Sequence, residues 1–112
     1  MSDALLVLST VGTPEDAQRI AGALVERRLA ACVNVLPGVT SVYRWQGRIE
    51  TEPEHLLVIK TTAEGFEPLR AALVSMHPYE VPEVLALPVR GGHGPYLAWL
   101  AAGVGAEDAP GR

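Results

Sequence analysis

An internal repeat constrains the fold of this chain more than any other feature. Residues 5–10 (LLVLST) resemble residues 56–61 (LLVIKT), and residues 33–37 (VNVLP) resemble residues 84–88 (VLALP), both at an offset of 51 residues. Each half therefore begins and ends on an apolar segment of strand length. A helical pattern lies between the two segments of each half, so the sequence predicts a strand–helix–strand unit that is used twice.

The first half contains a helix start directly after its opening strand. Residues 4–11 form a nearly continuous apolar run, which is typical of a strand in the middle of a sheet. Thr13 suits the N-cap position, Pro14 the first helical position and Asp16 the third. The helix predicted to follow has apolar residues at helical spacing, namely Ala17, Ile20, Ala21, Leu24 and Val25.

The second half predicts a matching helix. Thr61 and Glu64 have the spacing of a capping box, in which each side chain would bond to the other residue's backbone N–H. Pro78 prevents the helix from continuing. The apolar stripe of this helix consists of Phe66, Leu69, Leu73 and Met76.

The two halves meet in a hairpin turn at residues 45–48 (WQGR), where Gly47 supplies a positive φ. The complete order of strands and helices along the chain is then that of the ferredoxin-like α+β sandwich. We expect an antiparallel sheet in the order 4-1-3-2, numbered along the chain, with both helices on one face. A short helix is predicted from Pro95 to about residue 102. Residues 1–102 form the predicted domain, and residues 103–112 a flexible C-terminal tail.

Composition excludes several classes of protein. The 112 residues fit one domain, and a single cysteine cannot form an internal disulfide. No apolar run reaches the ~18 residues that a membrane span needs. The excess of 13 acidic over 9 basic residues argues against nucleic-acid binding. The first ten residues lack the basic segment of a signal peptide, so we expect a cytoplasmic protein.

The central hairpin is longer than the helices can cover. Its strands are predicted at about residues 32–45 and 48–62, whereas a typical strand has ~5–6 residues. The distal half could be a flexible ribbon, but exposed strand edges with aromatic residues favour an arm that pairs with another copy. The predicted contact residues of this self-association are Val42, Tyr43, Trp45 and Ile49.

Five linked segments are similar to one known family. They are residues 28–34 (RLAACVN), 41–47 (SVYRWQG), 60–62 (KTT), 77–83 (HPYEVPE) and 96–100 (YLAWL). Together they resemble the CutA divalent-cation-tolerance family over roughly residues 4–101. The resemblance implies a ferredoxin-like fold, a homotrimer similar in architecture to the PII signalling proteins, and a link to tolerance of copper and other divalent metals. It implies no established reaction.

We therefore expect a trimeric, cytoplasmic metal-binding or signalling module and not an enzyme. The alternative is a small-molecule sensor like PII, with clefts between subunits lined by Lys60, Tyr79 and Glu80. An enzymatic function finds little support, because acylphosphatases share this topology but place an arginine in the loop after the first strand. Residues 11–13 (VGT) contain none.

The candidate metal ligands are Cys32, His77, Glu80 and Glu83, with copper as the expected ion. None of them lies in a CxxC, HxxxH or HExxH spacing. Cys32 could be a soft Cu(I) ligand or a small buried hydrophobe. His77 could be a ligand or could cap a helix end. Glu80 and Glu83 could bind metal or form ion pairs across an interface, and we favour ion pairs.

Topology separates the thiol from the imidazole. Cys32 begins one edge strand and His77 precedes the other, so a site that contains both would have to cross a subunit interface. Three further acids, at positions 50, 52 and 54, alternate with period two and should share one strand face. They could hold a hard cation, but a solvated face that discourages edge pairing is the favoured interpretation.

Overall fold

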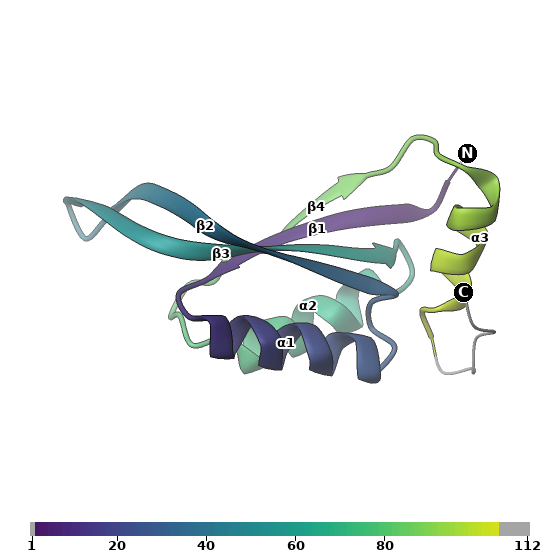
Figure 1. Ribbon diagram of the computed structural model, residues 1–112, viewed down its shortest axis with the longest axis horizontal. Helices are drawn as coiled ribbons and strands as arrows, with labels where there is room; N and C mark the ends of the chain where they lie inside the picture. Colours follow the sequence, from purple (N-terminus) through teal and green to yellow (C-terminus); the bar gives the residue numbers. More distant parts are fainter. Residues whose placement is uncertain (1, 106–112) are drawn as a thin grey trace.

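The computed structural model describes residues 2–105 as an α+β sandwich with a four-stranded sheet (Figure 1). The sheet is antiparallel in the order β2-β3-β1-β4, which is the predicted order read from the opposite edge. The ferredoxin-like prediction is thus confirmed. The elements are β1 (Ala4–Val11), α1 (Pro14–Glu26), β2 (Cys32–Trp45), β3 (Arg48–Thr62), α2 (Phe66–Met76), β4 (Leu85–Pro88) and α3 (Gly94–Ala102).

Both long helices cover the same face of the sheet (Figure 1). The core between the layers is mainly apolar, and Val7 of β1 lies opposite Ile59 of β3 within it. Helix α1 contributes Ile20 and Leu24 to it, in agreement with the predicted stripe. Side chains alternate along a strand, so every second residue of β1 and β3 points into this core.

Helix α1 begins as the sequence predicts. The Thr13 side chain accepts a hydrogen bond of 3.1 Å from the backbone N–H of Asp16, and Pro14 occupies the first helical position. This bond satisfies one of the N–H groups that a helix leaves unpaired at its start.

The predicted capping box at the start of α2 is wrong. Thr61 belongs to β3, is fully buried and donates its hydroxyl to the Leu29 carbonyl at 2.8 Å. Pairing with Leu5 keeps Thr61 extended, so it cannot serve as an N-cap. Helix α2 starts only at Phe66, after Gly65, whose N–H donates to the Thr62 hydroxyl at 3.1 Å.

The hairpin projects beyond the rest of the molecule (Figure 1). Strands β2 and β3 pair as far as Trp45 and Arg48. Of β3, only residues 55–62 also pair with β1. The turn uses positive φ angles of 50° at Gln46 and 78° at Gly47, as a two-residue hairpin loop of the I′ type requires. The overhanging half therefore lacks a neighbour strand on its β1 side.

A β-bulge interrupts β2 at Pro37 and Gly38. Leu36 pairs with Leu56 and Val39 with Glu54, so β2 advances three residues while β3 advances two. The extra residue reverses the alternation of β2 beyond this point. As a result, the odd-numbered residues of β2 from Val39 onward lie on the same sheet face as the even-numbered residues of β3.

The sheet face opposite the helices is largely apolar and carries no long helix. On it, Leu8 pairs with Val58 and with Leu85 of the edge strand β4. Leu85 and Leu87 are 56% and 44% exposed. We use the name open face for this surface, which comprises Leu6, Leu8, Leu36, Leu56, Val58, Leu85 and Leu87.

The remaining expectations concern the membrane and the C-terminus. No helix of residues 2–105 is long and apolar enough to cross a membrane. Of the predicted tail, residues 103–105 follow α3, and the Gly105 N–H donates to the Arg28 carbonyl at 3.0 Å. Residues 106–112 lie outside the described part of the chain.

Candidate functional site

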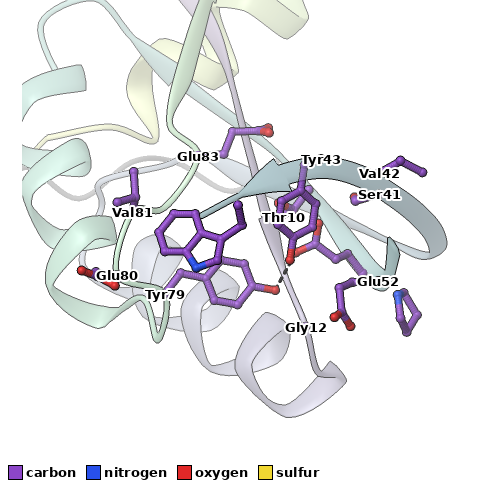
Figure 2. A pocket seen from close by; sticks show the side chains of 13 residues that line it. Thr10, Gly12, Ser41, Val42, Tyr43, Glu52, Tyr79, Glu80, Val81 and Glu83 are labelled. Carbon is purple, nitrogen blue, oxygen red and sulfur yellow. Dashed lines mark hydrogen bonds between the residues drawn. The ribbon is translucent and has the colours of Figure 1, made fainter. Parts of the chain in front are cut away.

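A cavity of about 710 Å³ lies where the hairpin meets the α2–β4 connection (Figure 2). Its walls come from the end of β1, the hairpin strands and residues 79–83. Three aromatic side chains line it: Tyr43, Trp45 and Tyr79. Four carboxylates line it as well: Glu52, Glu54, Glu80 and Glu83. None of the described residues that line it is Lys, Arg or His.

The bulge in β2 explains why acidic and aromatic residues converge here. Beyond it, Ser41 pairs with Glu52 and Tyr43 with Glu50, so these side chains share one face. The predicted common face of the three alternating glutamates is therefore confirmed. Two of the three, Glu52 and Glu54, face the cavity together with Tyr43.

Tyr79 is fixed at the cavity wall by a hydrogen bond to Glu54. Its hydroxyl donates to Glu54 Oε2 at 2.5 Å, and the carboxyl group belongs to a residue that is only 6% exposed. A Cβ added to Gly12 would lie 3.1 Å from the Tyr79 hydroxyl, so a glycine at this position leaves room for the approach. Burial, followed by the bond to Glu54 and its negative charge, raises the pKa of Tyr79 well above its usual value.

His77 holds the backbone that presents Tyr79. Its Nδ1 accepts from the Tyr79 N–H at 3.1 Å, and its Nε2 lies 2.8 Å from the Thr10 carbonyl. Because Nδ1 is an acceptor, the proton is on Nε2 and is donated to Thr10. Both ring nitrogens are thus engaged in a residue that is 8% exposed. In this conformation neither nitrogen is open to a metal ion.

The structure separates the predicted ligands into two groups. Cys32 pairs in register with Lys60 at one end of the sheet, and its Sγ lies 4.0 Å from Lys60 Nζ. His77 contacts Thr10, at the opposite end of β1. Cys32 and His77 therefore lie apart in one chain, in agreement with the topological argument.

The metal donors of the described residues do not gather around one point within a single chain. Among residues 2–105, no group of three His, Cys, Asp or Glu residues could hold one. In Figure 2, Glu52, Glu80 and Glu83 lie on different sides of the cavity. The ammonium group of Lys60, next to Cys32, would also repel a cation there.

The predicted ligand-binding cleft is split in the same way. Tyr79 and Glu80 line the cavity, but Lys60 does not. The ammonium group of Lys60 instead lies 5.8 Å from the centroid of the Tyr96 ring in α3. A single chain does not bring Lys60 to Tyr79.

The four predicted contact residues of the hairpin fall on two faces. Tyr43 and Trp45 lie on the face opposite Val42, because side chains alternate along β2. Arg44 lies on the same face as Val42 and pairs with Ile49, so Val42 and Ile49 share a face. Val42 and Ile49 are 66% and 59% exposed, and Tyr43 and Trp45 are 42% and 38% exposed. Val42, Tyr43 and Trp45 line the cavity of their own chain, whereas Ile49 does not.

Sequence reasoning missed the partnership between Glu54 and Tyr79. The alternation of glutamates on β3 indicates their common face, but it contains no information on which loop would meet them. The sequence argument uses the loop that contains Gly12 only because this loop lacks the arginine of acylphosphatases. A glycine that directly follows a buried strand is the one local signal of a close approach at this point.

Comparison with known proteins identifies the family. The family model described as CutA1 divalent ion tolerance protein matches residues 5–103. The chain belongs to this family. The divalent-cation tolerance protein CutA of Thermus thermophilus is 51% identical over 100 residues, which are 89% of this chain and 97% of that protein.

Solved CutA structures share the fold. CutA from Xylella fastidiosa gives a TM-score of 0.90 at 43% identity and covers 93% of this chain and 100% of its own. The structure titled periplasmic divalent cation tolerance protein CutA from Archaeoglobus fulgidus gives a TM-score of 0.84 at 36% identity, with 87% and 94% covered. The resemblance seen in the five sequence segments is therefore confirmed.

Proposed function

We propose that this protein acts in divalent-cation tolerance as a homotrimer that binds its ligand without catalysing a reaction. The observation that carries the proposal is the open face of the sheet. Leu36, Leu85 and Leu87 on this face are all more than two-fifths exposed. A contiguous apolar sheet surface of this kind is unfavourable in water and favours contact with another protein surface.

The overhanging hairpin supports the same assembly. Val42 and Ile49 lie on a part of the sheet that neither β1 nor the helices of the same chain cover. Contact with further copies would bury this surface together with the open face. The family to which the chain belongs, for which the sequence resemblance implies a homotrimer, favours three copies over two.

The oligomeric state tests the proposal directly. We expect light scattering or sedimentation to give three times the subunit mass of 11.9 kDa. A charge on the open face, in Leu87→Glu, should dissociate the assembly, whereas Val74→Glu on the exposed surface of α2 should leave it intact. A stable monomer of the unmodified protein would overturn the proposal.

We further propose that a divalent metal, with copper as the first candidate, binds where subunits meet. Donors that one chain keeps apart, such as Cys32 and the group His77, Glu80 and Glu83, can be combined only between chains. Calorimetric titration of the trimer with Cu²⁺ tests this proposal. Cys32→Ser should weaken binding, and so should His77→Ala, because His77 would exchange its bond to the Thr10 carbonyl for the metal in the assembled protein. His93→Ala, an exposed histidine before α3, serves as the control. Unchanged affinity in both test variants would remove both residues from the site.

A PII-like small-molecule sensor is the second candidate, and the cavity beside Tyr79 favours it. In the trimer, Lys60 of a neighbouring subunit would have to complete the cleft. A thermal-shift screen separates the two functions, because a ligand that binds the folded state raises its apparent stability. Stabilisation by nucleotides or metabolites and not by Cu²⁺ would favour the sensor.

We propose a cytoplasmic location, in line with a sequence whose single cysteine cannot form an internal disulfide. One relative carries the word periplasmic in its title, so the compartment varies among similar proteins. Fractionation of the source cells with an antibody against the protein tests this location. Recovery in a periplasmic or organellar fraction would contradict it.

A further inference from the structure

We propose that the cavity beside Tyr79 binds an extended organic cation, a guanidinium or ammonium group on a carbon chain. This proposal goes beyond metal tolerance and concerns a cavity whose walls all come from one chain, three of whose lining residues, Val42, Tyr43 and Trp45, are also predicted contacts of the trimer. It rests on the shape of the cavity, the nature of its walls and the distribution of its charges.

The size of the cavity suits an organic ligand. Its volume of about 710 Å³ lies within the ~300–1,000 Å³ of typical small-molecule sites. Its walls come from three separate parts of the chain, and it is pre-formed, because the Tyr79–Glu54 hydrogen bond and the two bonds of His77 hold one wall in place. A pre-formed site avoids the cost of ordering loops on binding.

The charge of the lining selects a cation. Four carboxylates and no basic side chain of the described residues face the cavity. The tyrosines report the same negative field: after burial, the charges of Glu52, Glu50 and Glu54 raise the pKa of Tyr43. This field repels an anionic ligand unless Lys60 of a neighbouring subunit completes the cleft, as the small-molecule sensor would require.

The aromatic side chains select the organic part of that cation. Tyr43, Trp45 and Tyr79 all line the cavity and offer ring faces to an alkyl chain or a positive group. Cations bind such ring faces, and they bind more strongly where water is excluded. An arrangement of rings and carboxylates is the usual recognition site for alkylammonium and guanidinium groups.

The spacing of the carboxylates favours an extended cation over a metal ion. A metal ion needs several donors around one point, and no such group exists among residues 2–105. Glu52, Glu80 and Glu83 instead lie around the periphery of the cavity (Figure 2). A ligand with a carbon chain can contact the rings in the middle and reach a carboxylate at its end.

Two sources could supply this chemistry. One is a free small molecule, and the other is an arginine side chain of a second copy, since Arg44 and Arg48 are exposed near the hairpin tip. Titration of the full-length protein with agmatine, an alkyl chain with a guanidinium and an ammonium end, tests the shared chemistry. Butylurea, which is similar in shape but neutral, is the matched control ligand.

We expect agmatine to bind, to perturb Trp45 fluorescence and to bind more weakly as salt is added, and we expect butylurea not to bind. The double variant Glu52→Gln/Glu80→Gln should weaken agmatine binding by about fivefold. Gly12→Ala, which crowds the Tyr79 hydroxyl, should also weaken it. Glu64→Gln, an exposed acid outside this cavity, should leave affinity unchanged.

The arginine variant distinguishes the two sources. If a second copy fills the cavity, Arg44→Gln/Arg48→Gln should strengthen agmatine binding, whereas a free ligand should bind equally well with or without these arginines. Absence of agmatine binding in both proteins would overturn the proposal, as would binding that the two glutamate substitutions leave unchanged. Sedimentation of each variant shows separately whether the trimer forms, and Cu²⁺ is absent from the titration, so failure of this proposal and failure of the proposed function can be told apart.

Discussion

The Tyr79 hydroxyl donates a hydrogen bond of 2.5 Å to the carboxylate of Glu54, a residue 25 positions earlier in the chain. This bond joins the α2–β4 connection to the hairpin strand β3. Burial and the Glu54 charge hold the pKa of Tyr79 above its usual value of about 10.

The first prediction concerns stability in alkali. In the unfolded chain Tyr79 loses its proton near pH 10, whereas in the folded chain it keeps the proton to higher pH. The unfolded state therefore binds fewer protons above this pH, and stability should fall as the pH rises. We expect Tyr79→Phe to reduce this fall, measured by urea unfolding at neutral and alkaline pH. An identical pH profile in the variant and the unmodified protein would contradict the assignment.

A second prediction concerns Ser9, whose hydroxyl is fully buried in the core and has no hydrogen-bond partner among residues 2–105. An unsatisfied buried hydroxyl costs about 1–3 kcal/mol. We expect Ser9→Ala to raise the free energy of unfolding by about 1 kcal/mol. Thr61→Val is the matched control and should lower it, because the Thr61 hydroxyl is bonded to Leu29. Destabilisation by Ser9→Ala would show that its hydroxyl has a partner.

The third prediction uses two glycines with opposite surroundings. A Cβ at Gly65 would lie 2.6 Å from Val104 Cγ1 and 3.0 Å from Thr61 Oγ1, whereas a Cβ at Gly22, within α1, would meet nothing within 4 Å. Overpacking should make Gly65→Ala destabilising by about 1–3 kcal/mol. Gly22→Ala should stabilise by about 0.5–1 kcal/mol, because alanine favours the helix. Thermal or urea unfolding measures both, and equal effects of the two substitutions would refute the packing argument.

The fourth prediction tests the bulge in β2. Deleting Gly38 removes the extra residue, so that regular pairing would turn Tyr43 and Trp45 to the other face of the hairpin. We expect Trp45, followed by fluorescence in a Trp99→Phe background, to become more accessible to iodide. Gly38→Ala retains the residue count and is the control, although its φ of 78° makes the alanine strained. Unchanged quenching after the deletion would mean that the turn and not the bulge sets the register.

The sequence was sufficient to predict elements whose causes are local. The Thr13 cap, the Gly47 turn and the long strands of the hairpin depend on neighbouring residues and on alternation, which a single sequence displays. Thr61 shows the limit, because the same residue type can cap a helix or pair in a buried strand, and only its partner Leu5 decides.

The candidate site was predictable only in part. Tyr79 and Glu80 were expected in a cleft, and the glutamates of β3 on one face. These two sets meet because the α2–β4 connection crosses the end of β1. This contact joins distant segments of the chain, and no local pattern in the sequence predicts it. The face on which Tyr43 and Trp45 lie depends on one extra residue at the bulge, and the sequence signals this only through Pro37 and Gly38.

The bulge determines which face of the hairpin each later side chain of β2 occupies. Because side chains alternate, adding or removing one residue near Gly38 exchanges inner and outer surfaces for the entire arm, while two residues change only its reach. Length changes in this arm should therefore be tolerated in even steps, and an odd step would need a second bulge to compensate. A one-residue insertion can thus move side chains that face the cavity to the opposite face of the hairpin, with no change in the side chains themselves.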